Sequence, residues 1–143
     1  LFFYIGDVSG KGVPASITMS RCETLFQELV LHTSAPSDIL DSLNKRLCCN
    51  NRAQMFVTAF AGVLDLETGE LSYSNAGHVT PYLVEAGTPA KELPRPKGKP
   101  LGIVPNTKYE DLSCVIKPGQ FVVSYTDGVT EAEDNSGKLF GNA

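Results

Sequence analysis

The chain has 143 residues, 42% of them hydrophobic and 20% charged, a composition that allows one domain with a real core and excludes a disordered tail. Its net charge of -4 provides no general basic field for neutralising phosphates, so we expect no nucleic-acid partner. No apolar run is as long as a membrane span, and the first residues lack a secretory pattern, so we expect a cytoplasmic protein without membrane contact.

Two helices are predicted to follow a buried first strand. The continuous apolar run LFFYIG, residues 1–6, is typical of such a strand. After a glycine-rich turn, apolar residues recur at helical spacing as far as His32. A second helix is predicted within residues 34–50, with Ser37 as its N-cap and a leucine-rich face. We expect both helices to pack on one face of a sheet.

Strands are predicted for most of the second half. Residues 55–87 are rich in β-branched and aromatic side chains around the turn ETGE, which predicts a hairpin and a third strand after NAGH. Residues 88–106 hold five of the nine prolines and four basic residues, and are predicted to be irregular and exposed. Strands are predicted again in 109–116 and 121–127. This order indicates an α+β fold with mainly antiparallel sheets.

The stretch GDVSGKG, residues 6–12, lies between the first strand and the first helix. A P-loop would need GxxxxGK followed by a hydroxyl residue, but here the spacing is one residue short and Gly12 replaces the hydroxyl. Asp7 would also repel a phosphate. Asp7 therefore fits better as a ligand for a hard cation such as magnesium or manganese. An Asp that caps the helix or closes a turn is the alternative.

A second segment repeats this pattern. In FVVSYTDGVTE, an apolar strand ends at Asp127 and the chain turns at once through Gly128. Two strands that each place an Asp at the same kind of end can direct both carboxylates at one cation. The flanking glycines let backbone carbonyls approach the same ion.

Four segments in this order and spacing resemble the bacterial metal-dependent protein phosphatases of the PPM family: YIGDVSGKGVPAS, MFVTAFAGVLDLETGELSYSNAGHVTPYLV, KPLGIVPN and PGQFVVSYTDGVTEAEDNSGKLFG. The sequence is most similar to the sporulation stage II E and sigma-factor-regulation branch. The resemblance implies one PPM-type phosphatase domain over residues 1–143. Its expected fold is an α-β-β-α sandwich of two mainly antiparallel sheets flanked by helices, truncated at both ends, with N- and C-terminal strands missing.

The resemblance also implies a metal site. Asp7 would bridge two ions, Mn²⁺ or Mg²⁺, the carbonyl of Val8 would add a ligand, and Asp127 would bind one of the ions. Asp7 and Asp127 are therefore the expected catalytic residues. Lys11 is a candidate for attracting the substrate phosphate, with a solvated lysine as the alternative.

Two further side chains are weaker candidates. His78 in NAGH could act as a proton donor or ligand, or could be a turn residue whose ring hydrogen-bonds the backbone. Glu131 is well placed to hold the turn that follows Asp127.

The function implied by the resemblance is a phosphoserine/phosphothreonine protein phosphatase that uses metal-activated water. Its expected substrate is a phosphorylated regulatory protein such as an anti-sigma-factor antagonist, and a sensory or receiver domain is expected upstream. A non-catalytic, phosphatase-like interaction module is the alternative.

Overall fold

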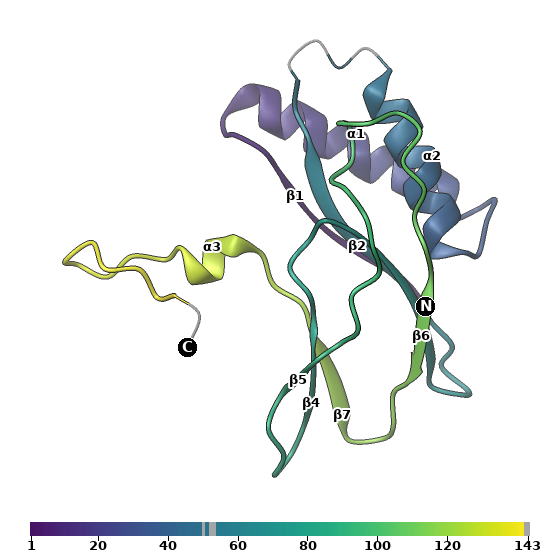
Figure 1. Ribbon diagram of the computed structural model, residues 1–143, viewed down its shortest axis with the longest axis vertical. Helices are drawn as coiled ribbons and strands as arrows, with labels where there is room; N and C mark the ends of the chain where they lie inside the picture. The colour runs from purple at the N-terminus through teal and green to yellow at the C-terminus, as the bar shows by residue number, and fades with distance from the viewer. Residues whose placement is uncertain (50, 52–53, 142–143) are drawn as a thin grey trace.

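The computed structural model describes residues 1–49, 51 and 54–141 (Figure 1). Helices and strands follow the predicted order of one strand, two helices and then strands. Their bounds are β1 (Phe2–Val8), α1 (Val13–Leu29), α2 (Pro36–Cys48), β2 (Val57–Leu64), β3 (Glu70–Ala76), β4 (Tyr82–Glu85), β5 (Lys91–Glu92), β6 (Leu112–Val115), β7 (Gln120–Val123) and α3 (Asp127–Thr130).

The strands form two antiparallel sheets. One sheet has four strands in the order β1-β2-β3-β6, and the other has three in the order β5-β4-β7. All pairings between these named strands are antiparallel, which confirms the sequence prediction. The hairpin predicted around ETGE is β2–β3, whereas the strand after NAGH is β4 and belongs to the second sheet.

Alternating side chains of the four-stranded sheet divide the core into two layers. Ala59 and Ala61 of β2 face the helices and pack with the leucines of α2. Phe60, between them in sequence, faces the other way and packs with Tyr73, Leu83 and Val122. The two sheets therefore stack on one another as a sandwich, with the helices outside the larger sheet.

Both long helices cover the same face of the four-stranded sheet (Figure 1). Each begins with a proline in its first turn, where a missing N–H costs no hydrogen bond. The third helix, α3, has four residues and follows β7. Within the described chain, no helix combines the length and apolar character needed to cross a membrane.

The predicted N-cap of the second helix is wrong. Helix α2 begins at Pro36, so that Ala35 occupies the N-cap position and has no capping side chain. Ser37 lies inside the first turn, where its N–H donates to one carboxylate oxygen of Asp111 and its hydroxyl to the other, both at 2.7 Å. A carboxylate distant in sequence therefore satisfies a free N–H of this helix start.

The proline-rich segment is largely irregular, as predicted, but only part of it is exposed. Its basic side chains are exposed, whereas Leu93 and Leu101 are buried in the two core layers. Leu101 also exchanges two backbone hydrogen bonds with Val57, at 2.8 and 3.0 Å. The segment is therefore fixed against the start of β2.

Candidate metal centre

Asp7 lies in a strand and not in the glycine turn. Its strand β1 remains paired with β2 through Val8, and Asp7 stands opposite Thr58 in the register. The turn begins only at Ser9, whose N–H donates to the carbonyl of Phe56 at 2.8 Å. The sheet therefore fixes the backbone of Asp7 more firmly than the predicted turn would.

Asp127 follows its strand less directly than predicted. Strand β7 ends at Val123, and three residues, 124–126, separate it from Asp127, the first residue of α3. The carbonyl of Asp127 accepts a hydrogen bond from the N–H of Glu131 at 2.7 Å, which closes this short helix. The turn at Asp127 is thus held by backbone hydrogen bonds.

A cavity of about 350 Å³ brings the two aspartates together. It lies where the end of β1, the start of β2 and the short helix α3 meet. The residues that line it are Asp7, Val8, Ser9, Gly10, Lys11, Phe56, Thr58, Asp127 and Glu131. All four site residues predicted from the sequence (Asp7, Val8, Lys11 and Asp127) therefore share one cavity with Glu131.

The ionised form of the Asp7 carboxyl group is disfavoured in this cavity. Burial raises its pKa above the ordinary value, and hydrogen bonding and repulsion from the Asp127 carboxyl raise it further. The backbone of Val8 opposes this shift, while Glu131 adds to it. A cation between the carboxylates would relieve this repulsion.

The donor set fits a hard divalent cation. Carboxylate and backbone oxygens are the ligands that Mg²⁺ and Mn²⁺ prefer, and Mg²⁺ keeps several waters in its shell. Asp7 and Asp127 could hold such an ion, with the carbonyl of Val8 near them. Among the residues described, no group of three His, Cys, Asp or Glu side chains is arranged to hold a metal. Water would therefore have to complete the coordination.

His78 is buried behind the cavity and does not line it. The residue is 2% exposed, and its Nδ1 lies 2.8 Å from the hydroxyl oxygen of Thr58. Nδ1 therefore bonds a side chain, while the backbone of Tyr125 also hydrogen-bonds the imidazole, as the turn-residue alternative expected. Burial lowers the pKa of His78, while the Tyr125 backbone and the Asp127 charge act in the opposite direction.

Thr58 is a cavity residue that the sequence reasoning missed. It is the one polar side chain in β2, whose sequence is VTAFAGVL. A lone hydroxyl in an apolar strand is a signal that could have been noticed. Its partner Asp7, however, is set by the strand register, which the sequence alone did not define.

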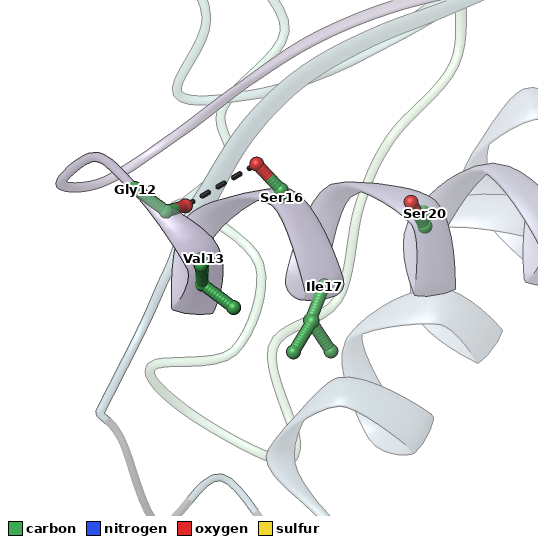
Figure 2. Close-up of a pocket in the computed structure, with 5 residues that line it drawn as sticks. All are labelled: Gly12, Val13, Ser16, Ile17 and Ser20. Carbon is green, nitrogen blue, oxygen red and sulfur yellow. Dashed lines mark hydrogen bonds between the residues drawn. The ribbon is translucent and has the colours of Figure 1, made fainter.

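Volume does not identify the site. A larger cavity of about 540 Å³ lies along the start of α1 and is lined by Gly12, Val13, Ser16, Ile17 and Ser20 (Figure 2). In that cavity the hydroxyl of Ser16 donates to the carbonyl of Gly12 at 3.2 Å. None of these five side chains titrates or is a usual metal ligand. The smaller, carboxylate-lined cavity is therefore the better candidate.

The fold does not support a nucleotide-binding P-loop. Such a loop connects a strand of a parallel sheet to a helix, whereas β1 pairs antiparallel with β2. Two stacked antiparallel sheets, helices outside the larger one and a carboxylate pair at the end of β1 together define a fold of the PP2C phosphatase type.

Comparisons with known proteins identify the family. Residues 1–143 match the family described as Stage II sporulation protein E (SpoIIE), and the chain belongs to this family. It is 30% identical to Phosphoserine phosphatase RsbU of Bacillus subtilis over 135 residues, covering 94% of this chain and 40% of that protein. It is 29% identical to Protein IcfG of Synechocystis over 168 residues, covering 99% of this chain and 26% of that protein. The chain thus spans less than half of either relative.

Solved structures show the same fold. The RsbU and RsbW domains of Rv1364c from Mycobacterium tuberculosis match with a TM-score of 0.79 at 29% identity, over 92% of this chain and 36% of that one. The SiaA-PP2C domain of Pseudomonas aeruginosa also matches with a TM-score of 0.79, at 20% identity, over 99% of this chain and 56% of that one. RsbX in complex with magnesium matches with a TM-score of 0.69 at 17% identity, over 90% of this chain and 60% of that one.

Proposed function

We propose that this chain is the catalytic part of a metal-dependent phosphoserine/phosphothreonine protein phosphatase. One observation carries the proposal: Asp7 and Asp127, far apart in sequence, line the same cavity, and the Asp127 carboxyl raises the pKa of Asp7. A cation between the two carboxylates would offset their mutual repulsion. Membership of the SpoIIE family and the likeness to a phosphoserine phosphatase support the same activity.

Each proposed role belongs to a named group. Asp7 and Asp127 would hold two Mn²⁺ or Mg²⁺ ions, and the Val8 carbonyl would add a further ligand. Bound ions of this kind supply charge neutralisation for a phosphoryl group and acidify water. The ammonium of Lys11, at the rim of the same cavity, attracts the substrate phosphate. A carboxylate cavity would repel that phosphate without these positive charges.

We further propose a phosphorylated regulatory protein as the substrate, such as an anti-sigma-factor antagonist. The likeness to RsbU and to the SpoIIE family supports this class of substrate. An upstream sensory or receiver domain in the full-length protein would control the activity. Phe56, which lines the cavity and is 38% exposed, offers an apolar contact to such a partner.

A second candidate is a non-catalytic module that keeps the phosphatase fold. The observation that favours it is the lack, within the described ranges, of three ligating side chains around one point. Such a module would bind a phosphorylated partner without hydrolysing it.

Hydrolysis separates the two candidates. The full-length protein is incubated with a phosphoserine peptide in Mn²⁺, in Mg²⁺ and in EDTA, and phosphate release is measured. The phosphatase proposal expects release that requires the metal and is lost in Asp7→Asn and Asp127→Asn. Binding of the peptide without release in either metal would favour the interaction module.

A further inference from the structure

The hydroxyl of Thr58 stands beside the proposed metal ligand. Thr58 is opposite Asp7 in the β1–β2 register, so both side chains project from the same face of the sheet at neighbouring positions. Both line the carboxylate cavity. A threonine hydroxyl can donate one hydrogen bond and accept others. The cavity therefore holds one neutral donor beside its carboxylates.

The orientation of this hydroxyl is set by a buried histidine that contacts it. The Thr58 hydroxyl oxygen lies 2.8 Å from Nδ1 of His78, which is 2% exposed. Because burial lowers the pKa of His78, the imidazole is neutral and carries one N–H. Whichever ring nitrogen carries the proton, the bond to Nδ1 fixes one direction of the hydroxyl and leaves the other for the cavity.

The histidine is itself held rigidly. Its N–H donates to the side-chain oxygen of Asn75 at 2.7 Å, and the Asn75 amide donates back to the His78 carbonyl at 3.1 Å. Between Asn75 and His78 in the sequence, Gly77 has φ +74 and forms a β-bridge with Ala59 of β2. A Cβ at Gly77 would lie 2.9 Å from Pro100. The turn thus places the imidazole under Thr58 with little freedom to move.

Burying a polar imidazole is less favourable than burying an apolar side chain, because the polar group loses its water on folding, and His78 is 2% exposed. An apolar side chain at this position would avoid that cost, but it could not hold the Thr58 hydroxyl.

We propose that Thr58 is a phosphate-contacting residue of this site and that His78 is its positioning residue. The Thr58 hydroxyl donates to a phosphate oxygen beside Asp7, or accepts from water bound to that phosphate, and His78 keeps the hydroxyl in that rotamer. This inference rests on the proposed function for its substrate. The inference adds Thr58 and His78 to the site, and neither residue is among the proposed metal ligands.

The first test removes only the hydroxyl. Thr58→Val keeps the β-branched shape in the strand, Thr58→Ser keeps the hydroxyl, and Thr88→Val is a matched control. Thr88 is exposed in the β4–β5 turn, and its hydroxyl bonds the Glu85 carbonyl at 3.1 Å. We expect Thr58→Val to lower kcat on a phosphoserine peptide about tenfold, with Thr58→Ser and Thr88→Val close to wild type.

The second test uses inorganic phosphate as a probe that needs no turnover. Its affinity for the Mn²⁺-loaded full-length protein is measured by calorimetry. We expect Thr58→Val to weaken phosphate binding severalfold and Thr58→Ser to preserve it. A protein that binds phosphate in this Thr58-dependent way but hydrolyses nothing would contradict the proposed function and support the inference.

The third test addresses His78. His78→Asn can keep a polar atom near Nδ1, whereas His78→Phe cannot. We expect His78→Phe to lower kcat as Thr58→Val does, His78→Asn to recover part of it, and the double variant Thr58→Val/His78→Phe to be no worse than either single one. Ring nitrogen NMR shifts of His78, with exposed His32 as internal reference, should change in Thr58→Val.

Three results would count against the inference. One is Thr58→Val with wild-type kcat and wild-type phosphate affinity while Asp7→Asn is inactive, which would leave the proposed function standing. Another is additive losses in the double variant with unchanged ring shifts of His78 in Thr58→Val, which would show that the two residues act separately. The third is equal losses in Thr58→Val and Thr88→Val.

Discussion

The carboxyl groups of Asp7 and Asp127 line one cavity although the two residues lie near opposite ends of the sequence, and Asp127 raises the pKa of Asp7. Strand β1 delivers one carboxylate and the chain after β7 delivers the other. Because these strands belong to different sheets, the site exists only when the sandwich is assembled.

Replacing the carboxylate of Asp7 by an amide should abolish most of the activity. In Asp7→Asn the side chain keeps its size in the strand but loses the charge that would hold both ions. Several kcal/mol of lost transition-state stabilisation corresponds to a fall of about a hundredfold or more in rate. The measurement is Mn²⁺-dependent peptide dephosphorylation by the full-length protein. Asp65→Asn, in the exposed β2–β3 turn, is the matched control and should stay active; a near wild-type rate in Asp7→Asn would contradict the catalytic role.

The same substitution should stabilise the protein when metal is removed. Folding raises the pKa of Asp7 above 3.8, so the folded state holds a proton more readily than the unfolded state. The free energy of unfolding therefore falls as the pH rises through the window above 3.8, and Asp7→Asn removes this loss. Denaturation in EDTA at pH 7 should show Asp7→Asn as more stable than wild type.

Asp65→Asn provides the opposite case. The N–H groups of Thr68 and Glu67 lower the pKa of Asp65, so its ionised form is favoured in the folded state. Its replacement should not stabilise the protein at pH 7. If both variants shift the stability in the same direction, repulsion between Asp7 and Asp127 is not the cause.

Metal binding should appear as added stability. A ligand that binds only the folded state at a hundred times its Kd stabilises by about 2.7 kcal/mol. We expect Mn²⁺ or Mg²⁺ to raise the Tm of the wild-type protein and to raise it much less in Asp7→Asn and Asp127→Asn. Sodium chloride at equal ionic strength controls for salt screening. An equal rise in wild type and both variants would place the ions elsewhere.

Acidification should destabilise the protein through His78. Burial lowers its pKa below 6.5, so the unfolded state takes up the proton first as the pH falls. The stabilisation is complete above 6.5 and is lost below it, at no more than about 1.4 kcal/mol per pH unit for one proton. Urea denaturation between about pH 7.5 and about pH 5 should show this slope, and His78→Asn should flatten it. An unchanged slope in His78→Asn would assign the effect to other groups.

Two glycine substitutions should each lower the free energy of unfolding, for different physical reasons. A Cβ at Gly98 would lie 2.0 Å from the backbone oxygen of Asn75, so the backbone must shift. Gly12 has φ +80 but no atom within 4 Å of an added Cβ, so its replacement meets only backbone strain. We expect each of Gly98→Ala and Gly12→Ala to destabilise by about 1–3 kcal/mol, the first through the clash and the second because the backbone conformation of Gly12, φ 80 and ψ -161, is essentially restricted to glycine. Chemical denaturation measures both, and wild-type stability in either variant would contradict its explanation.

The sequence alone predicted the helices and strands and their order, because the patterns that indicate them are local. The continuous apolar run at residues 1–6 and the β-branched and aromatic residues of 55–87 predict strands by their composition, and the strands are there. The carboxylate pair was also foreseen, since each Asp follows an apolar strand. That inference needed only the pattern around two positions.

The remaining features depend on contacts between distant segments. The pairing of Asp7 with Thr58 follows from a register that no local signal fixes. The contact between His78 and Thr58 joins strand β2 to the turn that follows β3, 20 positions later in the sequence. The sequence also placed Asp127 at the end of its strand, but β7 ends at Val123 because pairing with β4 stops there.

The carboxylate of Asp111 that binds Ser37 has a consequence for how the protein folds. The two residues are 74 positions apart, so the first turn of α2 obtains this acceptor only after the chain preceding β6 has docked. A loop of that length closes slowly compared with a helical turn. The first turn of α2 should therefore stay open early in folding. Its amides should become protected from hydrogen exchange late, together with those of β6. Asp111→Ala should speed unfolding without slowing the initial formation of the helix.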